Sequence, residues 1–256
     1  MLISILLPVY NEKTVYLTAC LNSIANQSYD NWECIIVIEG ETRKPLEVVS
    51  YFSGIDHRFK IIKPKKRLGL VGSLNLGLKS CSGLLVARID SDDFMHRHRL
   101  KEQVKIACQY PNFDVIGCWL QIIDNTGNYK KVRTYPEHHA SIVKKFLFRS
   151  AVAHPAILYR KSAVEKVGGY NADMRNAEDL DLWLRMIKAG CIFYNIPKVL
   201  TYYRENPLRS QSHWEYNLKT RLQNRYIFGG FKDWLSIIVL FCFSRVLLLT
   251  RKTIFK

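Results

Sequence analysis

The sequence of 256 residues lacks the features of a disulfide-rich secreted domain or of a nucleic-acid-binding protein. Its seven cysteines are an odd number with no C-x-x-C pair, which predicts reduced thiols that fill the core in a cytosolic compartment. No helix-turn-helix, base-stacking motif, zinc-ligand spacing, internal repeat or low-complexity segment is present. At this length we expect one catalytic domain with a tail, and a core that needs no structural metal.

Acidic side chains are scarce, and the resulting charge is uneven. The chain has 38 Lys and Arg residues against 22 Asp and Glu residues, which gives a net charge of +16. From Lys198 onward there are eleven basic residues and only three acidic ones. Such a surface suits either a nucleic acid or an anionic membrane.

An apolar stretch in the same region favours the membrane. Residues 234–250 are apolar except for two serines, one arginine and one threonine, and basic residues flank them. A spanning helix needs roughly 20 apolar residues. We therefore expect residues 206–256 to form a basic, apolar helical tail that lies on an anionic membrane surface and does not bind nucleic acid. A helix packed on the catalytic domain is the alternative.

The first ninety residues alternate apolar runs with amphipathic stretches. The apolar runs occupy residues 2–9, 32–38, 59–62 and 84–89, and the stretch at 14–24 carries an apolar stripe at helical spacing. The amino terminus lacks a basic region and a cleavage site, so its apolar run predicts a buried strand and not a signal peptide. The pattern predicts an α/β fold with a mixed, mainly parallel sheet and flanking helices.

The pattern changes after residue 93. A strand at 115–123, an Asn-Thr-Gly-Asn turn at 125–128 and a returning strand predict an antiparallel hairpin added to the parallel part. The remaining expected helices lie near residues 99–109, 141–148, 162–167 and 180–188.

Three carboxylates end the strand predicted at residues 84–89. Asp90, Asp92 and Asp93 follow it directly, at the edge where open α/β sheets bind ligands. Carboxylate oxygens suit Mg²⁺ or Mn²⁺, and such an ion neutralises a departing diphosphate. An acidic turn that caps the helix beginning near residue 98 explains the same residues.

Two other motifs accompany this cluster. The run P-V-Y-N-E at residues 8–12 ends the first strand, and a glycine-punctuated run at residues 66–77 opens a helix. In this order and spacing the motifs resemble the inverting glycosyltransferase family 2, which has the GT-A (Rossmann-like) fold. The resemblance covers about residues 1–205. It implies a nucleotide-sugar donor half at 1–95 and an acceptor half at 96–205.

The resemblance also implies the donor site. The donor would be a nucleotide sugar bound with Mg²⁺ or Mn²⁺, with Asp92 as the main metal ligand and Asp90 beside it. The implied donor-binding residues are Pro8, Tyr10, Glu12, Glu39, Arg67, Asn75, Asp90, Ser91 and Asp92.

Residue 39 departs from the family pattern. The family usually has two aspartates before the glycine at position 40, whereas this chain has Ile38 and Glu39. The carboxylate of Glu39 can accept a hydrogen bond from a base N–H, but its extra methylene changes its reach. We expect a UDP-sugar as the donor, although this departure leaves the selectivity for the base open.

A Glu-Asp pair opens the helix predicted near residue 180. Transfer with inversion needs a base that reaches the acceptor hydroxyl on the face opposite the leaving diphosphate. The resemblance gives this role to Asp179 and places Glu178, His154 and Trp183 on the acceptor side. Glu178 would either orient the acceptor or raise the basicity of Asp179. Acidic residues are also favoured in any first helical turn, and His154 could be a purely structural histidine.

The predicted function is an inverting glycosyltransferase of cell-surface polysaccharide biosynthesis. It would transfer a sugar to a hydroxyl of a glycan or lipid-linked acceptor at the cytoplasmic face of a bacterial inner membrane. One alternative is a nucleotide-sugar-binding protein without activity. The other is a sugar-1-phosphate nucleotidyltransferase, although those enzymes usually carry a glycine- and arginine-rich loop where this chain has residues 10–13.

Overall fold

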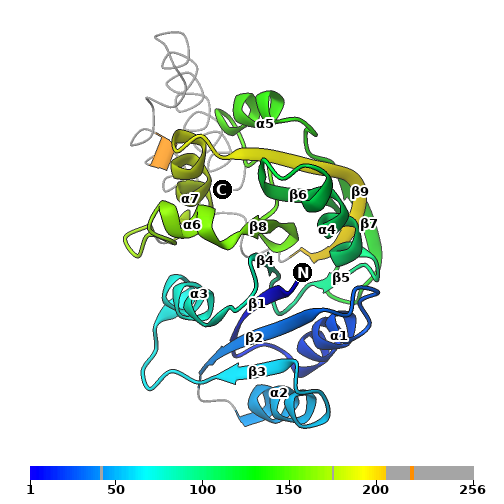
Figure 1. Ribbon diagram of the computed structural model, residues 1–256. Coiled ribbons are helices and arrows are strands. Elements are labelled where there is room, and N and C mark those ends of the chain that lie inside the picture. The colour runs from blue at the N-terminus through cyan, green and yellow to red at the C-terminus, as the bar shows by residue number, and fades with distance from the viewer. Residues whose placement is uncertain (41–42, 175, 206–219, 222–256) are drawn as a thin grey trace, which may run out of the picture.

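The computed structural model describes residues 1–40, 43–174, 176–205 and 220–221. Within these ranges the chain forms one nine-stranded sheet with helices packed on both faces (Figure 1). The strand order is β3-β2-β1-β4-β8-β6-β9-β5, and β7 pairs with β6 outside this path. The expected mixed α/β sheet with flanking helices is confirmed.

The N-terminal half supplies the parallel part of the sheet. Strands β1, β2, β3 and β4 pair only in parallel with one another. The helix expected at 14–24 is confirmed, and a helix that we did not expect, α2, follows β2. The bounds are β1 (Ile3–Tyr10), α1 (Thr14–Ala25), β2 (Trp32–Glu39), α2 (Arg43–Ile55), β3 (Phe59–Ile62), α3 (Gly69–Ser80) and β4 (Leu85–Arg88).

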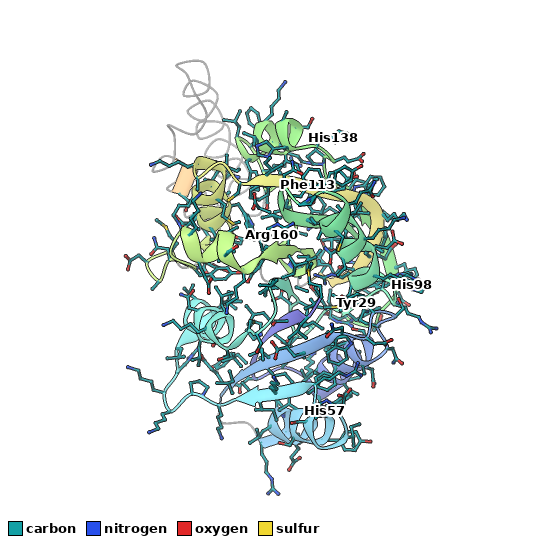
Figure 2. All side chains as sticks on the ribbon, viewed as in Figure 1. Tyr29, His57, His98, Phe113, His138 and Arg160 are labelled. Carbon is teal, nitrogen blue, oxygen red and sulfur yellow. The ribbon has the colours of Figure 1, made fainter. Side chains whose placement is uncertain are left out.

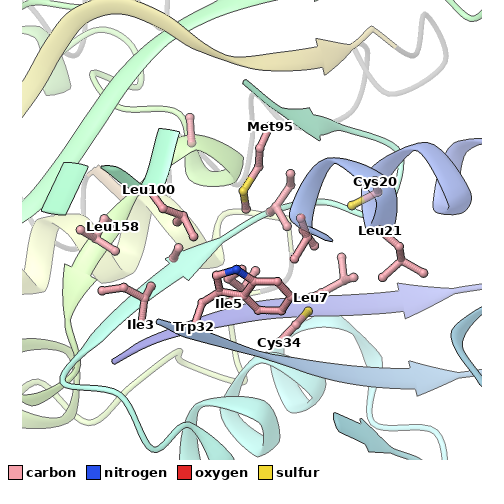
Figure 3. Close-up of a cluster of buried hydrophobic side chains, with 14 of the residues drawn as sticks. Ile3, Ile5, Leu7, Cys20, Leu21, Trp32, Cys34, Met95, Leu100 and Leu158 are labelled. Carbon is pink, nitrogen blue, oxygen red and sulfur yellow. The ribbon is translucent and has the colours of Figure 1, made fainter. Parts of the chain in front are cut away.

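Strand β1 has a core on each side because successive side chains of a strand point to opposite faces. Ile5 and Leu7 belong to the cluster that contains Cys20 and Leu21 of α1, shown in Figure 3. Leu6 belongs to a second cluster, with Leu74 and Leu78 of α3. All of these side chains are buried. The two clusters fix the carboxyl end of β1, where the motif at residues 8–12 begins.

Gly77 allows α3 to lie close against the sheet. A Cβ atom at this position would lie 2.3 Å from Leu6 Cδ1 and 3.0 Å from Val37 Cγ2. The close approach brings the N-terminus of α3 beside the end of β2, so Glu39 meets the first residues of the helix.

The C-terminal half extends the sheet with mixed pairing. The expected hairpin is confirmed, with β6 and β7 antiparallel across the turn, and the expected helices begin within a few residues of their predicted starts. The bounds are β5 (Phe94–Met95), α4 (Arg99–Gln109), β6 (Phe113–Ile123), β7 (Tyr129–Arg133), α5 (His139–Phe146), η1 (His154–Ala156), β8 (Leu158–Arg160), α6 (Lys161–Lys166), α7 (Glu178–Lys188) and β9 (Ile192–Arg204).

Strand β8 joins the two halves because it pairs antiparallel with both β4 and β6. Arg160 at its end donates through Nε to the carbonyl oxygen of Phe113 at 3.0 Å (both labelled in Figure 2). The fully buried Arg99 donates to the carbonyl oxygens of Pro155, Arg88 and Ile157 at 2.8 to 3.0 Å. These bonds hold the end of β4 against the start of the acceptor half.

The expected tail at 206–256 lies outside the described residues except for Thr220 and Arg221. Arg221 is buried and donates through Nε to the carbonyl oxygen of Phe146 at 3.0 Å. Among the described helices, none is long and apolar enough to cross a membrane. The membrane association of residues 234–250 stays a prediction.

Candidate active site

A pocket of about 660 Å³ opens where the carboxyl ends of β1, β2 and β4 meet the acceptor half. The site residues expected from the sequence come from elements far apart in the chain, and all but two of them line this pocket. Those lining it are Pro8, Tyr10, Glu12, Glu39, Arg67, Asp90, Ser91, Asp92, His154, Glu178 and Asp179.

Asn75 and Trp183 do not line the pocket. The Asn75 amide donates to the carbonyl oxygen of Tyr170 at 2.8 Å and accepts from its backbone N–H at 2.9 Å. It thereby fixes the turn at Gly169, whose φ of +73° favours glycine. Trp183 is fully buried, because helix α7 turns it into the second core cluster. The structure gives both residues roles in holding the fold, and their expected contacts with donor and acceptor stay predictions.

The turn after β4 is anchored by the end of β9. The Arg204 backbone N–H donates to Asp93 Oδ1 at 2.8 Å, and Arg204 Nε donates to the carbonyl oxygen of Asp92 at 3.1 Å. Asp93 is fully buried, and this burial, together with the charges of Asp90 and Asp92, raises its pKa. Asp93 therefore holds the turn, while Asp90 and Asp92 face the pocket.

These aspartates fit a divalent cation. Asp90, Asp92 and Asp93 each offer a carboxylate oxygen, and the three oxygens lie within 4.8 Å of one another. Oxygen donors at this spacing match Mg²⁺ and Mn²⁺, which commonly keep several waters and bind substrate phosphates. Because Asp93 is buried, Asp90 and Asp92 are the ligands open to the pocket.

Arg88 is a pocket residue that the sequence reasoning missed. It is buried at the end of β4 and pairs through Nη2 with Asp90 Oδ1. Its Nε and Nη1 have no hydrogen-bond partner, and its positive charge lowers the pKa values of Glu178 and Asp179, against the larger effect of burial. The available signal was an arginine inside an otherwise apolar strand.

Glu39 binds the start of helix α3. Its two carboxylate oxygens accept the backbone N–H groups of Leu68 and Gly69, each at 3.1 Å, and the Ser73 hydroxyl. The longer side chain therefore acts as a cap for a helix whose first N–H groups have no partner within the helix. Glu39 still lines the pocket, so its expected contact with the nucleotide base stays a prediction.

Tyr10 and Arg67 form one wall of the donor end. The Arg67 guanidinium lies 4.4 Å from the centre of the Tyr10 ring, and both side chains are exposed. At the same strand end, the Ser91 hydroxyl lies 3.4 Å from Glu12 Oε2. The motif at residues 8–12 and the aspartate turn are thus in direct contact.

Glu178 and Asp179 lie half-buried at the start of α7 and face the pocket. Burial raises the pKa of both carboxyls, and the neighbouring charge of Asp179 raises that of Glu178 further. Asp179 Oδ1 accepts the backbone N–H of Leu180 at 2.7 Å. A carboxylate with a raised pKa is suited to accept a proton near neutral pH.

His154 has features of both alternatives, a structural histidine and a residue of the acceptor side. It is buried, and its Nε2 lies 2.9 Å from the Tyr170 hydroxyl, so it is a satisfied structural histidine. Burial lowers its pKa well below the ordinary value, which favours the neutral ring. It also lines the pocket beside Pro155.

The acceptor half adds three side chains that are not among the site residues expected above. Arg133, Tyr135 and Tyr203 line the pocket from the end of β7, the following loop and β9. No motif marks Arg133 and Tyr135 in the sequence, whereas Tyr203 lies in the Tyr-Tyr-Arg run at residues 202–204, which resembles a late Tyr-Arg motif of the family. The three side chains meet only through the hairpin and the pairing of β6 with β9.

Comparison with known proteins agrees with this arrangement. The family model described as glycosyl transferase family 2 matches residues 4–168. The chain is 29% identical over 255 residues to the O-antigen biosynthesis glycosyltransferase WbnJ of Escherichia coli, covering 94% of this chain and 95% of that protein. It is 30% identical to the UDP-Gal:alpha-D-GlcNAc-diphosphoundecaprenol beta-1,3-galactosyltransferase of Escherichia coli, covering 77% and 72% of the two chains.

A solved structure supports the fold. The crystal structure of S. aureus TarS 1-349 in complex with UDP-GlcNAc superposes with a TM-score of 0.70 at 21% identity. The match covers 89% of this chain and 66% of that one. The likeness confirms the expected GT-A fold. With the family model matching residues 4–168, it follows that the chain belongs to glycosyltransferase family 2 and is a glycosyltransferase.

Proposed function

We propose that the chain is an inverting, metal-dependent transferase that uses a UDP-sugar to glycosylate a glycan or lipid-linked glycan during bacterial surface-polysaccharide biosynthesis. The observation that carries this proposal is the shared pocket. Asp90 and Asp92 from the end of β4 and Glu178 and Asp179 from the start of α7 line the same cavity. One group of carboxylates can bind the donor while the other acts on the acceptor.

In this proposal the donor is bound by two groups of residues. Tyr10, Glu12 and Arg67 bind the nucleoside end of the donor, and Asp90 and Asp92 hold Mg²⁺ or Mn²⁺. The ion, when bound, neutralises charge on the leaving diphosphate. The bonds of Arg204 to the turn hold these aspartates at the end of β4.

Asp179 removes the proton of the acceptor hydroxyl. The hydroxyl oxygen then forms a bond to the anomeric carbon of the donor sugar while the bond from that carbon to the diphosphate oxygen breaks. The configuration at the anomeric carbon inverts, and UDP leaves. Glu178 supports proton acceptance, because two neighbouring carboxylates each make ionisation of the other less favourable.

The proposed donor and the proposed pathway are supported by the names of the relatives. One relative is named for UDP-Gal, and the TarS structure contains UDP-GlcNAc, which supports uridine as the base. WbnJ is named for O-antigen biosynthesis, which supports a surface-polysaccharide role. We further propose that residues 206–256 hold the enzyme at the cytoplasmic face of the inner membrane through their basic and apolar side chains.

The test is release of UDP from a panel of UDP-sugars by the full-length protein with Mn²⁺ present. We expect slow hydrolysis of at least one donor without acceptor, and faster UDP release when a suitable glycan acceptor is added. A panel of GDP-, dTDP- and CMP-sugars run in parallel tests the base. If no nucleotide sugar is hydrolysed or transferred, the proposed donor and reaction are refuted, and nucleotide-sugar binding without activity is the alternative to test. Release of pyrophosphate from a nucleoside triphosphate would support a nucleotidyltransferase instead.

A further inference from the structure

Arg133, Tyr135 and Tyr203 form a compact group at the acceptor side of the pocket, which we call the acceptor-mouth cluster. The Arg133 guanidinium lies 5.6 Å from the centre of the Tyr203 ring. Arg133 also lies close enough to Tyr135 to lower the pKa of its hydroxyl against the larger effect of burial, and the ammonium of Lys145 lies 5.7 Å from the centre of the Tyr135 ring. Two aromatic rings therefore flank one guanidinium at the pocket wall.

The cluster lies beside the carboxylates of α7. Burial raises the pKa of Tyr135, and the charge of Asp179 adds to this rise, so the two side chains are within electrostatic reach. All three residues of the cluster line the same pocket as Asp179, so a molecule whose hydroxyl is presented to Asp179 can reach Tyr135 and Arg133 with its neighbouring groups.

Arg133 is weakly neutralised by the protein. Its nearest carboxylate is Glu205, at 4.0 Å, and the other oxygen of Glu205 is 3.2 Å from the Lys130 ammonium. The Arg133 side chain is 41% exposed, and exposed ion pairs at such distances contribute little. Among the described pocket residues from the acceptor half, Arg133 is the only Lys or Arg side chain.

The surrounding strand strengthens the positive field. Lys130 and Lys131 precede Arg133 on β7, a strand that pairs only with β6 and whose other residues are exposed. Arginine offers a planar fork of N–H donors that matches phosphate oxygens, which makes it well suited to phosphate recognition. The donor diphosphate is expected at Asp90 and Asp92, where a bound divalent ion neutralises its charge, which leaves Arg133 for an anion of the acceptor.

We propose that Arg133, between Tyr135 and Tyr203, binds a phosphate group of the acceptor, so that the acceptor is a sugar carrying a phosphate or diphosphate close to the reacting hydroxyl. The aromatic rings would contact the apolar face of the sugar, and the guanidinium would bind the anion. This inference rests on the proposed transferase function, and it narrows the acceptor from any glycan to a phosphorylated one.

Binding measurements separate this inference from the proposed function. The full-length protein is first saturated with UDP and Mn²⁺, which fills the donor side. It is then titrated with geranyl diphosphate, with N-acetylglucosamine 1-phosphate, and with geraniol and N-acetylglucosamine as uncharged controls. The first anionic probe represents a lipid-linked diphosphate, and the second represents a phosphate on the glycan itself.

We expect at least one anionic probe to bind, and its uncharged control to bind at least tenfold more weakly. Arg133→Gln should weaken the anionic probe on the order of tenfold while UDP binding stays within twofold. Arg133→Lys should recover part of the loss, because it keeps the charge without the planar fork. Arg43→Gln, which removes an equally charged but exposed arginine on α2, is the matched control and should change nothing.

Three results would overturn the inference: no anionic probe binds while UDP does, Arg133→Gln binds the probe as the wild type does, or Arg133→Gln loses UDP instead. The last result would assign Arg133 to the donor. Failure of UDP itself to bind would count against the proposed function, so the two failures are distinguishable.

Discussion

Replacement of Asp179 by asparagine should make the protein more stable and less active, and the gain in stability should grow with pH. Asn keeps the shape and an oxygen that can accept the Leu180 N–H, but it removes a charge that burial disfavours. The pKa of Asp179 is raised in the folded protein above its unfolded value, which is about 4. Wild-type stability is therefore lost as pH rises from about 4 through the folded pKa, whereas the variant does not lose it.

The size of the effect follows from the linkage between pKa and stability. One unit of pKa shift corresponds to about 1.4 kcal/mol. Asp179 is only half-buried, and the charge of Arg88 opposes the shift. We therefore expect a gain of about 1 to 2 kcal/mol in the free energy of unfolding at pH 8, and little gain at about pH 3.5, below the unfolded pKa.

Urea unfolding of both proteins at about pH 3.5 and at pH 8, without nucleotide or metal, measures this difference. Asp30→Asn, at an exposed carboxylate, controls for the removal of one charge. UDP release by Asp179→Asn should fall by a factor of about 10² to 10⁴, as for loss of a general base. A variant that is destabilised at both pH values, or one with an equal gain at about pH 3.5 and at pH 8, would refute the assignment of a raised pKa to Asp179.

Three further outcomes are expected. Asn75→Ala should lower the free energy of unfolding by about 1 to 3 kcal/mol, because both backbone groups of Tyr170 lose their hydrogen-bond partner. Urea unfolding measures this loss, and calorimetry should show that the affinity for UDP stays within about threefold of the wild type. Glu39→Ala should also cost about 1 to 3 kcal/mol, because three donors at the start of α3 lose their acceptor, and unchanged urea unfolding would contradict the capping role. In a pH–rate profile, kcat/KM should fall as the pH drops because the base becomes protonated. The midpoint of this fall should lie above the ordinary carboxylate pKa of about 4. A profile that stays flat down to about pH 5 would contradict the raised pKa values of Glu178 and Asp179.

The fold was predictable where local pattern and sheet topology agree. The apolar runs of the first half place the ends of β1, β2 and β4 at one edge of a parallel sheet, so the residues that follow them had to come close together. Helix α2 was missed because its stretch contains only three buried residues, Pro45, Val49 and Phe52.

The site was predictable where a short motif carries it, and not where the contacts are made across the chain. Asn75 belongs to a motif, but its partner Tyr170 lies 95 residues away, and nothing local shows that the amide is used to hold a turn. Trp183 follows the acidic pair, yet the helical rotation of α7 directs it into the core. Arg133 reaches the pocket only because β7 folds back on β6, and no local sequence motif predicts that Arg133 faces the site.

Calorimetric titration with UDP tests the central claim most directly, with and without Mn²⁺, for the wild type, Asp92→Asn and Asp179→Asn. The account predicts that UDP binding depends on Mn²⁺, that Asp92→Asn weakens it at least tenfold, and that Asp179→Asn leaves it within twofold of the wild type. This result would separate a metal-binding donor side from a base on the acceptor side of one pocket. Binding that is equally strong without metal, or that survives in Asp92→Asn and is lost in Asp179→Asn, would contradict the account.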